Sequence, residues 1–282
     1  MNPPATAGVP HASVPPHPAI VPVPAFADNY IWLLSDRERR RAAVVDPGDA
    51  APVLAALASA GLTLAAVLVT HHHADHVGGL PELRAAFPDA VVHGPAASRV
   101  EGIDRRWRAG DAFGLEGFDA RFDVIEIPGH TLDHIAFFAR RIGDDDLRPV
   151  LFCGDTLFAG GCGRVFEGTA AQMTASLGRL AALPHDTLVY CAHEYTTSNL
   201  RFALAVEPDN AALSERVRQT AELRAAGTPT VPSTLALERA TNPFLRTDAD
   251  DVRRAAQTRL GHAPADPVEV FAAVRAWKDG FR

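Results

Sequence analysis

Short apolar runs, each bounded by turn-forming residues, follow one another through the first two thirds of the chain and predict strands. The predicted strands span residues 19–23, 29–34, 42–45, 64–69, 91–92, 122–127, 135–139, 150–153 and 187–191. Helices are predicted between them at residues 51–60, where Gly61 supplies a stop signal, and at residues 80–87. This mixture of strands and helices predicts a layered α/β fold.

From about residue 197 the pattern changes to helical segments separated by polar, proline and glycine residues. The predicted helices span residues 199–206, 214–226, 234–239, 248–260 and 267–277. We therefore expect an α/β domain at residues 19–196 and a smaller, all-helical domain at residues 197–282. The second domain directly follows the last strand, so it can overhang one edge of the first.

Residues 1–18 are rich in proline and carry neither a basic segment nor an apolar core of the kind a secretory signal has. We expect them to form a disordered, proline-rich tail. No apolar run is long enough to span a bilayer. A soluble protein located in the cytoplasm is the expectation.

Composition narrows the possible partners. The formal net charge of −7 argues against nucleic acid or an anionic membrane as the partner. The three cysteines, Cys153, Cys162 and Cys191, form no CxxC pair and leave an odd thiol, which argues against a disulfide framework and fits the reducing cytosol. We expect the protein to act as a monomer.

Candidate chemistry is concentrated in residues 70–79, THHHADHVGG, directly after the predicted strand 64–69. Imidazole and carboxylate groups are ligands that zinc, iron and manganese prefer. His71 and His73 share one side of an extended segment, whereas Asp75 and His76 follow the turn. Two pairs of ligands within six residues indicate two metal ions.

Three further candidates, His130, Asp155 and His193, each stand just after a predicted strand. Because loops at one edge of an α/β fold converge, we expect all seven side chains to meet. His71, His73 and His130 would form one site and Asp75, His76 and His193 the other, with Asp155 bridging both. A bridging water would become hydroxide near neutral pH, which predicts hydrolysis of an ester, thioester, amide or phosphoester.

Several residues near these candidates have simpler interpretations. His72 points away from its neighbours, and His134 is expected to orient a ligand without binding metal itself. The three cysteines are expected to behave as small buried apolar residues. The glycines of AGGCG, residues 159–163, are expected to permit an unusual loop conformation beside the site.

Together these motifs resemble a known family. THHHADHVGG, VVDPGDA, IPGHT, GDTLF, AGGCGR and CAHEYT are similar to the metallo-β-lactamase superfamily, and with NPFLR and VRAWKDGF they resemble glyoxalase II, or hydroxyacylglutathione hydrolase. The resemblance implies an αββα sandwich with a helical domain that helps to hold glutathione. It implies hydrolysis of S-D-lactoylglutathione to glutathione and D-lactate, the second step of methylglyoxal detoxification. It also implies a binuclear centre of zinc, iron or manganese on the seven residues, with Asp75 and Asp155 in catalytic roles.

The same resemblance implies glutathione contacts at Arg164, Tyr195, Arg275 and Lys278. Arg164 stands where members often carry lysine, which keeps the charge and changes its geometry. Phe166 stands where some members have tyrosine, so a phenolic hydrogen bond would be missing. These departures affect the expected affinity for substrate, not the reaction class.

Two other interpretations remain open at this point. A mono-iron persulfide dioxygenase on the same superfold would use fewer ligands and would consume oxygen. A binding module that has kept the fold and lost catalysis predicts broken ligand motifs, whereas all seven candidates are present here.

Overall fold

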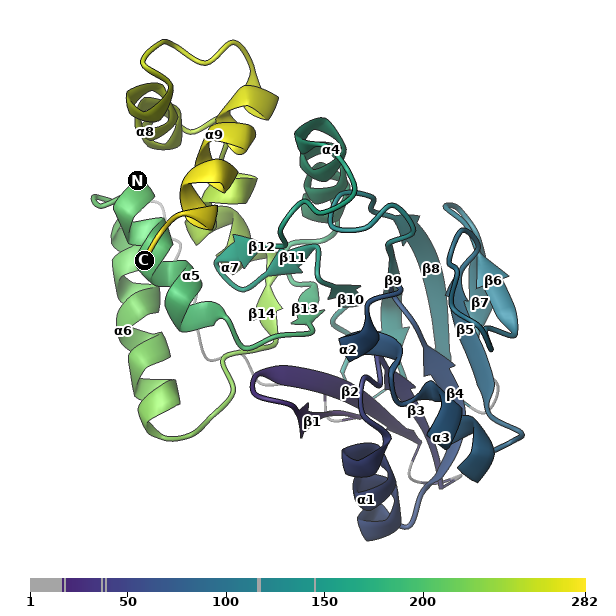
Figure 1. Cartoon of the computed structure of the whole chain (residues 1–282). Helices are drawn as coiled ribbons and strands as arrows, with labels where there is room; N and C mark the ends of the chain where they lie inside the picture. Colours follow the sequence, from purple (N-terminus) through teal and green to yellow (C-terminus); the bar gives the residue numbers. More distant parts are fainter. Residues whose placement is uncertain (1–16, 18, 37, 39, 116–117, 145) are drawn as a thin grey trace, which may run out of the picture.

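Two six-stranded sheets form the centre of the computed structural model, which describes residues 17, 19–36, 38, 40–115, 118–144 and 146–282 (Figure 1). The first sheet contains, in spatial order, β1 (Ile20–Ala25), β2 (Asn29–Asp36), β3 (Arg41–Val45), β4 (Thr63–Leu68), β5 (Val91–Pro95) and β6 (Arg105–Trp107). The second contains β14 (Ser233–Thr234), β13 (Leu188–Cys191), β10 (Val150–Gly154), β9 (Ile135–Ile142), β8 (Ala120–Glu126) and β7 (Ala112–Gly114). A separate hairpin pairs β11 (Leu157–Phe158) with β12 (Gly161–Cys162).

The central strands are buried on both faces because successive side chains point to opposite sides of a sheet. Along β2, Trp32 and Leu34 join the core shared with the second sheet, and Ile31 and Leu33 join a second core on the other face. That second core includes Leu57 and other residues of the helices that cover the first sheet. The near-continuous apolar runs of the sequence are explained by this double burial.

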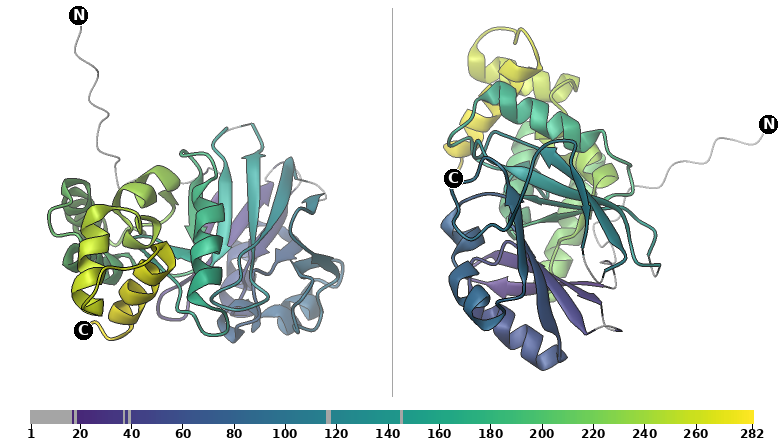
Figure 2. Two further views of the ribbon diagram at one scale, coloured as in Figure 1. Left: turned by 90° about the horizontal axis from the view of Figure 1, so that it is seen from above. Right: turned by 90° about the vertical axis from the view of Figure 1, so that its right-hand side faces the viewer.

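Helices α1 (Ala50–Ala60) and α3 (Leu80–Ala86) cover the outer face of the first sheet, and α4 (Ala170–Ala181) covers the second (Figure 2). The layers are therefore helix, sheet, sheet, helix, and the predicted αββα sandwich is confirmed. Helix α4 is absent from the sequence prediction, although Thr169 and Gln172 form a capping box at its start. The short helix α2 (Ala74–Val77) also occupies a place where only a turn is predicted.

The C-terminal segment contains α5 (Thr196–Val206), α6 (Ala211–Ala225), α7 (Leu235–Thr241), α8 (Asp250–Leu260) and α9 (Pro267–Asp279), with a 3-10 turn at Pro243–Leu245. All five predicted helices are present. This segment, predicted as all-helical, also contributes the two-residue strand β14, which pairs with β13. Phe202, Phe244 and Phe271 belong to the same apolar cluster as the residues of the second sheet, so the helical domain is packed continuously onto the sandwich.

At the N-terminus, the predicted tail falls almost wholly on residues 1–16 and 18, which lie outside the described residues. His17 is described and is buried, and its backbone N donates to Tyr190 Oη at 2.8 Å. His17 is therefore part of the folded domain. No helix in the described part of the chain combines the length and apolar character needed to cross a bilayer.

Candidate active site

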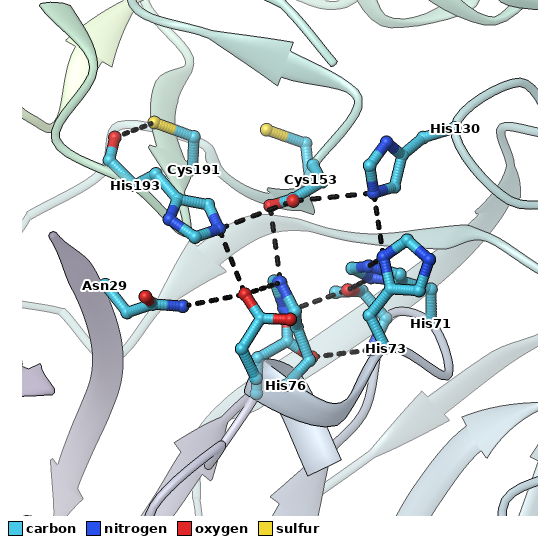
Figure 3. A network of polar contacts seen from close by, with 12 residues as sticks. Asn29, His71, His73, His76, His130, Cys153, Cys191 and His193 are labelled. Atoms are coloured by element: carbon cyan, nitrogen blue, oxygen red, sulfur yellow. Dashed lines mark hydrogen bonds and ion pairs between the residues drawn. The ribbon is translucent and has the colours of Figure 1, made fainter. Parts of the chain in front are cut away.

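The candidate ligands meet because the strands that carry them end at the same edge of the molecule. Strand β10 is parallel to β13, and both β10 and β8 are antiparallel to β9. The C-terminal ends of β8, β10 and β13 therefore lie together, and they deliver His130, Asp155 and His193. Strand β4 of the first sheet delivers His71 and the segment that follows it. Figure 3 shows these histidines pointing toward a common space.

Six of the seven side chains form two groups whose ligand atoms lie within 4.8 Å of one another: His71, His73 and His130, and Asp75, His76 and His193. Asp155 lies between the groups. Its Oδ2 is 3.5 Å from His130 Nε2 and 3.3 Å from His193 Nε2, and its Oδ1 is 3.4 Å from His76 Nε2. The arrangement matches the division expected from the sequence, with one carboxylate in contact with both groups.

Hydrogen bonds on the far side of each ring orient the imidazoles. His130 Nδ1 donates to the carbonyl oxygen of Arg164 at 2.8 Å, and His193 Nδ1 donates to Asp28 Oδ1 at 2.8 Å. Each of these bonds leaves Nε2 facing the common space. Partners of this kind fix the ring orientation and tautomer of metal-binding histidines.

Asp46 performs the same task for the first sheet, and the sequence analysis assigned it no role. Its carboxylate accepts from Thr70 N at 2.8 Å and from Thr70 Oγ1 at 2.7 Å, and its Oδ2 lies 3.1 Å from His76 Nδ1. Because the Thr70 hydroxyl donates to Asp46, it accepts from His71 Nδ1 at 3.0 Å. Asp46 is close enough to His71 and His76 to be a third possible ligand group. Its oxygens are already engaged, so it orients the two rings.

The donor set fits divalent metal ions. His73 Nδ1 is 3.2 Å from His71 Nε2 and 3.0 Å from His130 Nε2, and the latter two nitrogens carry lone pairs. His73 Nδ1 can supply at most one proton to this contact, whereas a cation would satisfy all three nitrogens. Within the described structure, Asp155 Oδ1 and His76 Nε2 are buried without a hydrogen-bond partner. Buried polar atoms of this kind indicate a missing partner.

The pKa shifts of the candidate ligands also favour the binding of cations at this site. Burial lowers the pKa of His71 well below its usual value and lowers that of His130, which leaves both rings neutral. Burial alone would raise the pKa of Asp155, but the rings of His76 and His193 hold it well below its usual value. Burial opposes protonation of His193 too, yet the carboxylates of Asp155 and Asp75 raise its pKa to about 10. The carboxylates are thus ionised and the site attracts positive charge.

The residues next to the candidate ligands make contacts that do not require them to bind metal. His72 Nδ1 is 2.9 Å from Asp133 Oδ1 and its Nε2 is 3.3 Å from Glu167 Oε1, so both of its ring nitrogens are engaged outside the ligand groups. His134 Nε2 accepts from the backbone N of Asp155 at 3.1 Å, so it orients this carboxylate as expected. All three cysteines are buried, and burial raises the pKa of Cys162 to about 11 and that of Cys191 to about 12. Protonated thiols of this kind are poor metal ligands.

A cavity of about 630 Å³ opens beside the ligand groups and extends to the helical domain. One end is lined by five of the candidate ligands: His73, Asp75, His130, Asp155 and His193. All four predicted substrate contacts line the same cavity: Arg164, Tyr195, Arg275 and Lys278. The volume lies within the range of small-molecule sites.

The aromatic side chains around this cavity contact the ligand histidines. The ring of Tyr195 stacks on that of His193 with centroids 4.7 Å apart and an interplanar angle of 5°. Phe166 lies 5.2 Å from the ring of His130 and is 61% exposed, so it offers an apolar face to the cavity.

The cationic side chains differ in what they can offer a ligand. Arg164 is exposed, and its Nε is 3.8 Å from Asp279, a separation that permits only a weak ion pair. Lys278 Nζ donates to the backbone oxygen of Ser198 at 3.1 Å and keeps further donor capacity. Arg275 is buried, and its Nη1 and Nη2 donate to Cys162 O and Asp279 Oδ1, both at 2.9 Å. The charges available to the cavity are therefore chiefly Arg164 and Lys278.

Comparison with known proteins gives the same assignment over residues 28–281. The model of the metallo-beta-lactamase superfamily matches residues 28–193, and that of the hydroxyacylglutathione hydrolase C-terminus matches residues 194–281. The chain is 57% identical over 260 residues to a hydroxyacylglutathione hydrolase of Alkalilimnicola ehrlichii, covering 92% of this chain and 98% of the relative.

Solved structures are similar at lower identity. The crystal structure of ETHE1 from Myxococcus xanthus has 28% identity and a TM-score of 0.57, covering 89% of this chain and 93% of that one. The structure of TTHA1623 in a di-iron-bound form has 27% identity and a TM-score of 0.53, covering 80% of this chain and 100% of that one.

The fold and the paired donor groups at its edge define a member of the metallo-β-lactamase superfamily. Within it, the chain belongs to the hydroxyacylglutathione hydrolase family, as both domain matches and the close relative show. The resemblance seen in the sequence motifs is confirmed.

Proposed function

We propose that this chain hydrolyses the thioester bond of S-D-lactoylglutathione and related S-2-hydroxyacylglutathiones, releasing glutathione and the 2-hydroxy acid. In the cell this would be the second step of methylglyoxal detoxification. One observation carries the proposal: a single cavity joins the two ligand groups to cationic side chains of the helical domain. The name of the relative that is 57% identical supports the same activity.

The metal centre is assigned to seven residues. His71, His73 and His130 would hold one ion, Asp75, His76 and His193 the other, and Asp155 both. Zinc is the proposed metal, and imidazole and carboxylate donors also suit iron and manganese. The di-iron form of the similar structure TTHA1623 supports two ions. When bound, divalent ions supply an activated water nucleophile and stabilise negative charge on the attacked carbonyl oxygen.

Asp75 is proposed to orient the attacking water and to accept its proton. Its side chain is 43% exposed and lines the cavity, whereas Asp155 is nearly covered. Asn29 Nδ2 donates to Asp75 Oδ2 at 3.1 Å, and the same oxygen is 3.4 Å from His193 Nε2. One oxygen is thus fixed by the protein, and the other remains available for proton transfer.

The glutathione part of the substrate carries two carboxylates, and Arg164 and Lys278 are proposed to bind them. Both cations line the cavity although the chain as a whole has a net charge of −7. Tyr195, stacked on His193, would contact the substrate next to the metal centre. Phe166 lacks a hydroxyl group, so its contact with the tripeptide would be apolar.

The test combines metal analysis with an assay of glutathione release from S-D-lactoylglutathione. The native protein should contain two metal ions per chain and should turn over this substrate. Asp155→Ala and His76→Ala should lose both metal and activity, because each removes a ligand from a buried site. One iron per chain, with oxygen uptake in the presence of glutathione persulfide, would instead indicate a dioxygenase.

A cytoplasmic monomer is proposed as the working form. The cysteines are unpaired in the described structure, which agrees with a reducing compartment. Both domains of one chain line the cavity, so a single subunit carries every proposed ligand and substrate contact.

A further inference from the structure

The hairpin formed by β11 and β12 builds one wall of the cavity. It lies between Asp155 and Arg164 in the chain, and the side chains of Phe158 and Cys162 line the cavity. The ring of Phe158 stands edge-on to that of His193, with centroids 5.8 Å apart. The position of this hairpin therefore determines the space between the metal centre and the helical domain.

Two side chains of the helical domain hold the hairpin backbone. Asn242 Nδ2 donates to the carbonyl oxygens of Phe158 at 3.2 Å and Gly161 at 2.9 Å. The backbone N of Gly160 donates to Glu238 Oε2 at 2.8 Å. Glu238 and Asn242 are fully buried and touch neither the cavity nor the ligand groups.

Two further contacts complete the set. Asn199 Nδ2 donates to Ala159 O at 3.1 Å, and Arg275 Nη1 donates to Cys162 O at 2.9 Å. Every residue from 158 to 162 thus has a backbone polar group paired with a side chain of the helical domain. A Cβ at Gly161 would lie 2.6 Å from the Asn199 amide, so the close approach requires glycine.

A buried ion pair fixes the orientation of Glu238. Its Oε1 accepts from Arg216 Nη2 and from Ser233 Oγ, both at 2.5 Å, and Arg216 Nη1 donates to Thr241 Oγ1 at 2.6 Å. Oε2 is left to accept from the hairpin and from Asn242 Nδ2 at 3.0 Å. Buried ion pairs contribute little net stability, and geometric specificity is their better-attested use.

We propose that Glu238 and Asn242 are positioning residues which, by holding the β11–β12 hairpin, set the affinity of the cavity for the glutathione part of the substrate. The inference rests on the proposed function for the identity of the ligand. It adds that the helical domain acts on the substrate through the hairpin backbone as well as through its own cavity-lining side chains.

The principal variant is Asn242→Asp, which keeps the shape of the side chain and replaces its donor by an acceptor. The new oxygen would face three other acceptors: Phe158 O, Gly161 O and Glu238 Oε2. The KM for S-D-lactoylglutathione should rise about tenfold with kcat changed less than about twofold, as expected for loss of buried hydrogen bonds that act on binding alone. Metal content should equal that of the native protein.

Asn210→Asp is the matched control. Asn210 caps α6 in the same domain, where its Oδ1 accepts from Leu213 N, and aspartate caps a helix equally well. Its Nδ2 donates to Ala240 O at 3.1 Å, so the control likewise replaces an amide donor that faces a backbone carbonyl, at a place that does not contact the hairpin. This variant should keep the native KM. Asn242→Ala removes the donor without adding repulsion, so it should raise KM by a smaller factor than Asn242→Asp does. This variant replaces Asn242→Asp as the test if the aspartate variant does not fold.

A second readout does not depend on turnover. Calorimetric titration with S-methylglutathione, which has no thioester bond, should show weaker binding to Asn242→Asp by the same factor as KM. The native protein could bind S-methylglutathione and still not hydrolyse S-D-lactoylglutathione. If Asn242→Asp then binds S-methylglutathione more weakly than the native protein does, the proposed reaction is wrong and the inference is supported.

Hydrogen exchange of the amides at residues 157–163 reports whether the hairpin has been released. Faster exchange there with an unchanged KM and unchanged binding of S-methylglutathione would overturn the inference. Loss of bound metal together with kcat would also overturn it, because the network would then serve the metal centre and not the substrate.

Discussion

Lys278 is the only lysine among the 27 cationic residues of the chain, and it lies in the substrate cavity. Burial, reinforced by the charge of Arg275, lowers its pKa to about 8. Below that pH the side chain is charged and would attract a carboxylate of the proposed substrate, and above it the side chain is neutral. We therefore expect the KM for S-D-lactoylglutathione to rise above about pH 8 while kcat follows a different profile. Steady-state kinetics across this range measure it.

The control for this titration is Lys278→Arg, which keeps a positive charge at every accessible pH. Any inflection near pH 8 that survives in this variant must come from another group. An identical KM profile in the two proteins would contradict the assignment to Lys278.

The seven candidate metal ligands could be singled out from the sequence because few residue types bind these ions and because the strand ends are visible as breaks in apolar runs. Asp28 and Asp46 could not be singled out in this way. Acidic residues are common beside turns, and which of them reaches the outer nitrogen of His193 or His76 depends on how the two sheets pack. The sequence also cannot show which cationic side chains are available to a substrate and which are already hydrogen-bonded within the protein. Arg275, which donates to Cys162 O, is of the second kind.

At the scale of secondary-structure elements, two glycines should respond oppositely to alanine. Gly61 ends α1 in the left-handed region, with φ of 64°, whereas Gly178 lies inside α4 with no atom near the position of a Cβ. Gly61→Ala should destabilise the protein by about 1 kcal/mol. Gly178→Ala should stabilise it by about 0.5–1 kcal/mol through helix propensity. Thermal unfolding midpoints should move down and up respectively; a shift of the same sign in both would contradict this account.

Elements of normal length were predicted because their apolar patterns span several residues. Strands β6, β7 and β14 have two or three residues each, and no periodicity can be detected over such a length. Strand β14 exists because Ser233 and Thr234 pair with β13, a contact between segments far apart in the chain. Helix α4 is of normal length, but its apolar pattern alone did not predict it. Its start could have been recognised from the capping box formed by Thr169 and Gln172.

At the scale of the whole molecule, the two domains are parts of one packed unit. Phe202 and Phe271 of the helical domain share an apolar cluster with Phe152 and Tyr190 of the second sheet. The change in sequence pattern near residue 197 locates where the helices begin, but apolar composition cannot reveal that they share a core with the sheet. The cavity between them is consequently lined by parts of a single packed unit.

The proposed metal ions should also stabilise this unit, because their ligands come from strand ends of both sheets. Ligands that bind only the folded state at a thousandfold excess over Kd contribute about 4 kcal/mol per site, or about 8 kcal/mol for two ions, which corresponds to roughly 15 °C in the unfolding temperature of a chain of this size. Removing metal with a chelator should lower the calorimetric midpoint by about that amount, and adding zinc back should restore it. The same treatment of Asp155→Ala, which lacks the shared ligand, should move the midpoint far less. An equal shift in that variant would mean that the stabilising ions bind somewhere other than the site formed by His71, His76, His130 and His193.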